Sequence, residues 1–177
     1  WETQYSRADA EAMANAALAR PPLYARVNPL KTDADTLCET LARQGVTAQK
    51  HDWIKNCVML SDTGSLLRLD AFREGWFHIQ DAASQLCAQA LGAQPGDTVL
   101  DVCAAPGSKS FTIAQQMNNR GAVHAFDLYE HKCRLIEEGA ARLGLSIVDA
   151  FVRDARTGTV LPMADRILCD VPCSGLG

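Results

Sequence analysis

VLDVCAAPGSK, residues 99–109, sets the architecture of this chain. Its apolar start predicts a buried strand that ends at Asp101, followed by a loop of small residues and a helix from about 110 to 117. Such a loop lets a ligand approach the backbone, and the helix N-terminus offers unpaired N–H groups. The stretch therefore predicts an α/β nucleotide site. With one glycine it matches neither the dinucleotide fingerprint nor a phosphate loop.

Composition limits the classes of protein that remain. The chain has 177 residues, 47% of them hydrophobic, which is enough for one core and a small second one. A net charge of −4 argues against nucleic-acid binding by bulk electrostatics but leaves room for a local basic groove. Seven scattered cysteines without a C-x-x-C pair indicate reduced thiols, a cytoplasmic location and no metal site. No apolar run suggests a membrane span. The start at Trp1 and the end at Gly177 suggest an excerpt from a longer protein.

The N-terminal part predicts a small α/β module. An alanine-rich helix, read as a packing helix or a linker, stops before Pro21-Pro22. A Thr32-x-x-Asp35 capping box opens a helix that carries Leu37 and Leu41 on one face. The expected strands of this module cover residues 23–28, 46–49, 57–60 and 75–80.

The helix that follows this module is expected over residues 82–91. Asp81 is its predicted N-cap, and Ala83, Leu86, Cys87 and Ala90 form its predicted apolar face. Just upstream, His78 and Gln80 face either a ligand or neighbouring backbone groups.

Acidic residues end successive predicted strands. Asp127 ends a strand at 122–126 and follows Asp101 by 26 positions, near where doubly wound folds place the acid that binds a ribose. Asp154 follows a strand at 146–152 and suits an adenine amino group. Solvated helix caps are the alternative for each acid alone. Together they favour an adenosine group and repel phosphate.

The last predicted strand, 166–169, leads into Asp170-Val171-Pro172-Cys173-Ser174-Gly175. Methyltransferases present groups to the accepting base at this position. A thiol here suits carbon chemistry, because C5 of a pyrimidine accepts a methyl group only after a thiolate has added at C6. Alternatively, Cys173 is a small buried hydrophobic residue.

Together, residues 101–109 and 170–175 resemble the RNA cytosine-C5 methyltransferases, nearest the bacterial 16S ribosomal RNA branch, over residues 23 to the end. The resemblance implies a Rossmann-like methyltransferase fold with a truncated parallel sheet, preceded by a small α/β subdomain. We divide the chain into an N-terminal helix or linker (1–22), the small α/β subdomain as a candidate for RNA contact (23–80) and a partial methyltransferase domain (81–177). It implies S-adenosylmethionine as cofactor. The residues it assigns to cofactor binding are Cys103, Ala104, Ala105, Pro106, Gly107, Ser108, Lys109, Asp127, Asp154 and Asp170. Ser108 stands where the family has a second glycine.

The same resemblance gives Cys173 a role in product release and places the nucleophile in a later Thr-Cys-Ser motif, which this chain lacks. We therefore expect the fragment to be inactive, with its fourth strand left as an edge that invites self-association.

The predicted activity is methylation of C5 of a cytosine in RNA through a covalent cysteine adduct, with 16S ribosomal RNA as the substrate that the resemblance implies and with no membrane or metal involved. A non-catalytic RNA-binding or assembly factor is the alternative. A DNA cytosine methyltransferase fits less well, because Val171-Pro172-Cys173-Ser174 replaces Gly-x-Pro-Cys-Gln. The basic residues considered for RNA contact, against ordinary solvated surface, are Arg20, Arg26, Lys31 and Arg73.

Overall fold

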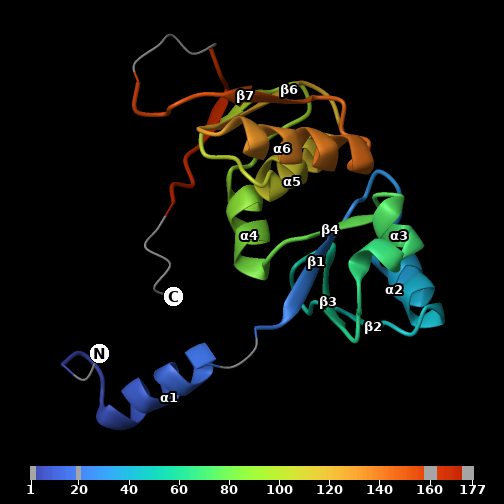
Figure 1. Cartoon of the computed structure of the whole chain (residues 1–177), viewed down its shortest axis with the longest axis vertical. Helices are drawn as coiled ribbons and strands as arrows, with labels where there is room; N and C mark the ends of the chain where they lie inside the picture. The colour runs from blue at the N-terminus through green and yellow to red at the C-terminus, as the bar shows by residue number, and fades with distance from the viewer. Residues whose placement is uncertain (1–2, 19–20, 158–162, 173–177) are drawn as a thin grey trace.

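A computed structural model of the chain describes residues 3–18, 21–157 and 163–172 (Figure 1). It contains two four-stranded sheets, one antiparallel and one parallel, each with helices packed on it. The α/β class predicted from the sequence is confirmed.

The first sheet is built by a β-α-β-β-α-β order of elements. Its strands are β1 (Leu23–Val27), β2 (Thr47–Lys50), β3 (Cys57–Ser61) and β4 (Phe77–Ile79), and they pair antiparallel in the order β2-β3-β1-β4. The helical elements are α2 (Ala34–Arg43), the short 3-10 turn η1 (Leu66–Arg68) and α3 (Asp70–Arg73). Leu37 and Leu41, both fully buried as predicted, pack with Val58 and Phe77 of the sheet. The helices therefore cover one face of this sheet.

Helix α2 begins differently from the prediction. Its N-cap is Asp33, not Thr32: Asp33 Oδ1 accepts a hydrogen bond from the backbone N–H of Thr36 at 2.8 Å, and Asp33 Oδ2 accepts one from the Thr36 hydroxyl at 3.0 Å. The Thr32 hydroxyl instead donates to the carbonyl of Asp33. Two adjacent residues of capping type make the position ambiguous in sequence, and the carboxylate takes it because it accepts both hydrogen bonds.

The second sheet is entirely parallel. Its strands are β5 (Thr98–Asp101), β6 (Ala122–Asp127), β7 (Val148–Val152) and β8 (Arg166–Leu168), in the order β7-β6-β5-β8. Helices α4 (Ala82–Ala90), α5 (Ser108–Gln116) and α6 (Glu130–Leu143) accompany them. Asp101 pairs with Leu168 and Asp127 with Val152, so the carboxyl ends of the four strands lie along one edge. Within the described residues β8 pairs only with β5.

Helix α4 buries a different face from the one predicted. Asp81 is its N-cap, as expected, but Ala83, Cys87 and Ala90 are exposed, and the buried positions are Gln85 and Ala88. The Gln85 amide donates to the carbonyls of Gln80 and Ala25, at 3.1 and 3.4 Å. The helix is therefore oriented by backbone groups of the first sheet that need a donor, which an apolar-periodicity argument does not detect.

Helix α1 (Arg7–Leu18) lies apart from both sheets in Figure 1, and Ala10 is its one buried residue. The helix itself was predicted correctly; a packed apolar face is not seen in it. None of the helices in the described ranges is both long and apolar enough to span a bilayer.

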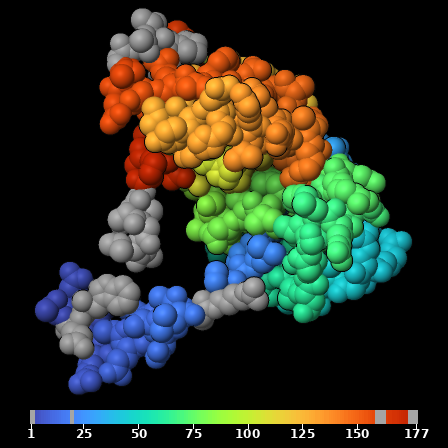
Figure 2. All heavy atoms as spheres, viewed as in Figure 1, coloured from blue at the N-terminus to red at the C-terminus, as the bar shows by residue number. Residues whose placement is uncertain are grey.

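The two sheets form contiguous modules, and Figure 2 shows their atoms packed directly together. Asn28 Nδ2 donates to the carbonyls of Gly75 and Leu143, and Lys31 Nζ donates to those of Glu74 and Arg142. Lys31 therefore connects the modules.

Two further basic residues considered for RNA contact, Arg26 and Arg73, also interact with other parts of the protein. Arg26 is buried, because its face of the first sheet packs on α5, and Arg73 pairs with Asp70. Arg26 is thus wrong as an RNA contact. Arg20 lies outside the described residues.

Candidate functional site

The loop 102–107 lies at the carboxyl edge of the parallel sheet and is hydrogen-bonded to the strands on both sides of β5. The N–H of Val102 donates to the carbonyl of Leu168 at 3.0 Å, and the N–H of Ala104 donates to the carbonyl of Phe126 at 2.8 Å. The loop thus spans from β8 to β6 across the end of β5. The Ala105–Pro106 peptide bond is cis.

Gly107 is the N-cap of α5, with a φ of +100°. A Cβ at this position would lie 2.5 Å from Cζ of Phe111, so both the backbone conformation and the contact require glycine. No side chain caps the helix, which leaves its first N–H groups facing the loop.

Asp101 lies beneath the loop with 1% of its surface exposed. Its Oδ2 accepts a hydrogen bond from the Ser110 hydroxyl at 2.7 Å, while Oδ1 has no partner among the described residues. Burial raises the pKa of this carboxyl to about 6. The Asp101 carboxylate thus holds the Ser110 hydroxyl of α5 beneath the loop.

Charged side chains surround Cys103. Lys109 Nζ and Asp170 Oδ2 form an ion pair at 2.6 Å. Burial raises the pKa of the Cys103 thiol, and the carboxylates of Asp101, Asp127 and Asp170 raise it further. These surroundings disfavour the thiolate form, so they do not activate Cys103 as a nucleophile.

Asp127 and Asp154 both lie at this edge but differ in their surroundings. Asp127 is 9% exposed; its Oδ1 accepts from the N–H of Tyr129 at 3.3 Å and lies 3.7 Å from Lys132 Nζ. Asp154 pairs with Arg156 at 2.7 Å, and the hydrogen bonds from Arg156 lower the pKa of its carboxyl to about 2. The structure thus brings Asp101 and Asp127 to the ends of adjacent strands and pairs Asp170 with Lys109, whereas the Asp154 carboxylate is engaged by Arg156.

The remaining predicted positions are placed as follows. Ala104 is buried, and Ala105, Pro106 and Ser108 complete the loop and the first turn of α5. Cys173, expected to serve product release, lies outside the described residues. Among the described residues no group of three His, Cys, Asp or Glu side chains is arranged to hold a metal ion.

Sequence reasoning missed a polar contact between β4 and the start of α5. His78 is 3% exposed, and burial lowers its pKa to about 3, so its ring is neutral. His78 Nε2 lies 3.2 Å from the carbonyl of Ser108, and the Thr112 hydroxyl donates to Gln80 Oε1 at 2.6 Å. The two strand residues thus meet α5, not a ligand. Their polarity in an apolar strand was the only available signal.

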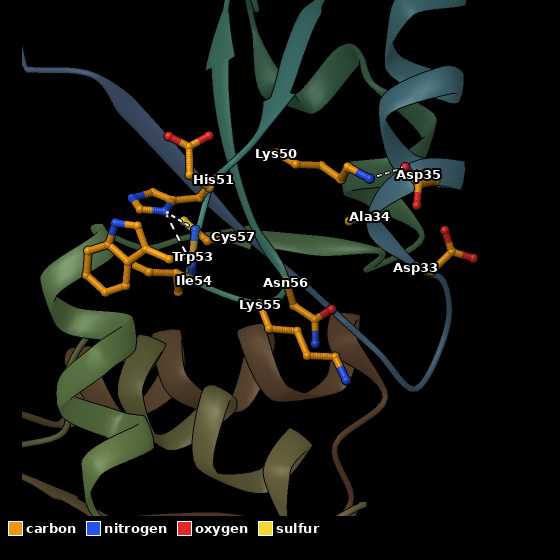
Figure 3. A pocket seen from close by; sticks show the side chains of 11 residues that line it. Asp33, Ala34, Asp35, Lys50, His51, Trp53, Ile54, Lys55, Asn56 and Cys57 are labelled. Carbon is orange, nitrogen blue, oxygen red and sulfur yellow. Dashed lines mark hydrogen bonds and ion pairs between the residues drawn. The ribbon is translucent and has the colours of Figure 1, made fainter.

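Two cavities lie elsewhere, on the first module, beside the loop that joins β2 and β3 (Figure 3). Their volumes are about 490 and 160 Å³. Neither is lined by a residue of the carboxyl edge.

Comparison with known proteins identifies methyltransferase relatives of this chain. A family model described as 16S rRNA methyltransferase RsmB/F matches residues 88–177, and a second, described as the ferredoxin-like domain of RsmF/B-like methyltransferases, matches residues 1–66. The probable ribosomal RNA small subunit methyltransferase B of Bacillus subtilis (strain 168) is 41% identical over 180 residues, covering 100% of this chain and 40% of its own length. Its counterpart in Synechocystis sp. is 35% identical, covering 100% of this chain and 41% of its own length. The chain therefore spans about 40% of the length of these curated relatives.

Solved structures agree on the fold. The crystal structure of PH0851 has a TM-score of 0.88 at 28% identity, over 96% of this chain and 39% of that one. A methyltransferase homolog protein from Pyrococcus horikoshii has a TM-score of 0.71 at 33% identity, over 80% and 47%. NSun6 from Pyrococcus horikoshii, solved with SFG, has a TM-score of 0.77 at 21% identity, over 86% and 63%, which bears on the fold alone. From the family model over residues 88–177 and these relatives, the chain belongs to the 16S rRNA methyltransferase RsmB/F family.

Proposed function

We propose that the whole protein methylates C5 of a cytosine in 16S ribosomal RNA, with S-adenosylmethionine as the methyl donor. The observation that carries this proposal is the carboxyl edge of the parallel sheet, where Asp101 and Asp127 end adjacent strands beside the start of α5 at Gly107. The relatives' names support an rRNA substrate and therefore a cytoplasmic location. We also retain the division into residues 1–22, 23–80 and 81–177 as a proposal.

The residues present fit the cofactor. A ribose needs acceptors for its two hydroxyls, and Asp127 offers a largely buried carboxylate at a strand end. The small residues 104–107, with Gly107 at positive φ, suit close approach of a ligand to the backbone. When bound, S-adenosylmethionine would supply an electrophilic methyl group.

Two other residues have proposed roles at this edge. Asp170, which is paired with Lys109, would place a carboxylate beside the cofactor's positive sulfur. Asp154 would accept a hydrogen bond from the adenine amino group once its ion pair with Arg156 is broken. These roles follow from charge and position at the strand ends.

The covalent chemistry is assigned to thiols other than Cys103. We propose that a cysteine outside this chain adds to C6 of the cytosine, that C5 then accepts the methyl group, and that loss of the C5 proton expels the thiolate. Cys173 is assigned to this release step. The raised pKa of Cys103 supports its exclusion as the nucleophile, because it disfavours the thiolate.

The decisive experiment uses the whole natural protein with unmodified 16S rRNA and isotope-labelled S-adenosylmethionine. Label should appear in C5-methylcytosine at one position, and a deletion strain should lack that methylcytosine. RNA binding without any transfer of label would instead identify a non-catalytic RNA-binding or assembly factor and would reject the proposed activity.

A further inference from the structure

The first sheet has one face that is only partly covered. Side chains alternate along β1, so Ala25 and Val27 enter the core under α2 while Tyr24 and Arg26 point to the opposite face. Arg26 on that face is buried against Gln115 of α5. Tyr24, two residues earlier on the same face, is half-buried and lines the smaller cavity.

The uncovered part forms a flat row across three strands. Tyr24 of β1 is directly opposite Met59 of β3, which is directly opposite Gln49 of β2. Met59 and Gln49 are both exposed. We call this row, together with His51 and Trp53, the aromatic platform.

The rim of the platform is a rigid loop between β2 and β3. His51 Nδ1 accepts hydrogen bonds from the N–H groups of Trp53 and Ile54, at 3.4 and 3.3 Å, and the N–H of His51 donates to the carbonyl of Cys57. Ile54 is 2% exposed and anchors the loop, whereas Trp53 is 70% exposed. The loop therefore holds a tryptophan ring out in solvent instead of burying it.

The rings form a continuous series. The ring centroids of Tyr24 and His51 are 5.9 Å apart, and those of His51 and Trp53 are 5.1 Å apart in an edge-to-face arrangement. The two cavities, of about 490 and 160 Å³, share Lys50, His51 and Asp52, so they adjoin along this series. Figure 3 shows Trp53 and His51 on one side of the larger cavity.

The charges at the cavity are mostly satisfied. Lys50 and Asp35 pair at 2.5 Å, and Asp33 caps α2. The Lys55 carbonyl is held by the Arg26 guanidinium at 2.9 Å, and no ion pair of the Lys55 ammonium occurs among the described residues. Lys55 and Asp52, which have no ion pair among the described residues, therefore line the same cavity as Trp53, and Figure 3 shows the Lys55 side chain extending away from the Trp53 ring.

We propose that the aromatic platform binds unpaired nucleotides of an RNA, with bases stacked on Trp53 and Tyr24 and a phosphate against Lys55. This rests on the proposed function, which supplies the RNA. Exposed rings on a four-stranded sheet suit bases of a single strand, because every base has a stacking face. Lys55, which lines the same cavity, can pair with a backbone phosphate further along the strand, and Asp52 can accept a hydrogen bond from a base amino group.

The test measures binding of the whole natural protein to a single-stranded segment of 16S rRNA and to the same segment closed as a duplex. Trp53→Ala should weaken the Kd for the single strand about 5-fold or more and change the Kd for the duplex little, whereas Trp53→Phe should retain most of the affinity. Lys55→Gln should lower the slope of log K against log salt by about 1.

The matched control is Leu67→Ala, because Leu67 belongs to the same module and is 71% exposed, against 70% for Trp53. This variant should bind both RNAs as the wild type does. Affinity for S-adenosylmethionine should be unchanged in Trp53→Ala, which separates RNA contact from damage to the cofactor edge.

Three results would overturn the platform. The first is an unchanged single-strand Kd in Trp53→Ala, and the second is an equal loss of affinity for the single strand and the duplex in that variant. The third is that Trp53→Ala loses self-association while its RNA binding stays intact, which would identify a second copy of the protein as the occupant. If the wild type binds the single strand through Trp53 but transfers no methyl group, the proposed function fails and the platform stands. If the wild type methylates rRNA and Trp53→Ala does so with the same RNA affinity, the platform alone fails.

Discussion

Replacing Gly107 with alanine tests the loop geometry most directly. Gly107 has a φ of +100°, and a Cβ there would meet Cζ and Cε1 of Phe111 at 2.5 and 2.9 Å. The ring is held on another side as well, since a Cβ at Gly139 of α6 would also lie 2.5 Å from Cζ. The phenyl ring therefore has little room to withdraw.

Two costs follow from this geometry. A side chain at positive φ costs about 1–2 kcal/mol, and forcing a methyl group into a packed site costs about 1–3 kcal/mol more. Gly96 supplies the control: its φ is +101°, and nothing lies within 4 Å of the added Cβ. Gly107→Ala should therefore lower the free energy of unfolding by about 2–5 kcal/mol, and Gly96→Ala by about 1–2 kcal/mol.

The assay is urea denaturation of both variants, with the midpoint and the slope fitted separately. In a double-mutant cycle with Phe111→Leu, the cost of the added methyl group should approach the Gly96 value, because the ring that opposes it is gone. Equal losses at Gly96 and Gly107 would refute the claim that the Phe111 ring fixes the loop.

Three further predictions concern the same molecule. Asp127→Ala should weaken S-adenosylmethionine binding to the whole protein by about 1–3 kcal/mol, the scale of a lost charge-assisted hydrogen bond; unchanged affinity in calorimetry would remove Asp127 from the ribose role. Burial lowers the pKa of His78 from 6.5 to about 3, so its neutral ring stabilises the fold above pH 6.5, and this stability is lost as the pH falls from 6.5 toward 3. Burial raises the pKa of Asp101 from 3.8 to about 6, so its neutral carboxyl stabilises the fold below pH 3.8, and this stability is lost as the pH rises from 3.8 toward 6. Between pH 4 and 6 the free energy of unfolding should therefore rise more steeply with pH in Asp101→Asn than in the wild type, and less steeply in His78→Gln. Each change of slope should be at most about 1.4 kcal/mol per pH unit, and profiles identical to the wild type would contradict both assignments. The 177-residue chain should self-associate through β8, where Ile167 is 57% exposed, and a clean monomer in light scattering at high concentration would count against this.

The carboxyl edge could be predicted because local patterns determine it. Once residues 98–101 and 122–127 are recognised as parallel strands, the register places Asp101 and Asp127 at one edge whatever surrounds them. The φ of Gly107 follows similarly from a tight turn into a helix. These features depend on neighbours close in sequence, so periodicity and residue type suffice to find them.

Features that depend on contacts between the modules could not be predicted in this way. Arg26 has the sequence context of a surface cation, yet it is buried because its side of β1 packs against α5. The exposed face of α4 has good apolar spacing, but Gln85 turns inward because carbonyls of the first sheet need a donor. Composition and spacing describe one element at a time, whereas the positions of these side chains depend on contacts between two elements from different modules.

The contact between β4 and α5 joins these two kinds of feature. The carbonyl of Ser108 belongs to the first turn of α5, immediately after Gly107, and it lies 3.2 Å from His78 Nε2 and 3.1 Å from the Thr112 hydroxyl. With the His78 ring neutral, only the Nε2–H tautomer can donate to that carbonyl. A displacement of β4 would therefore leave a buried N–H without its acceptor, at a cost of about 1–3 kcal/mol. The position of the loop at the cofactor edge is thus coupled to the first sheet, whose far end carries the aromatic platform.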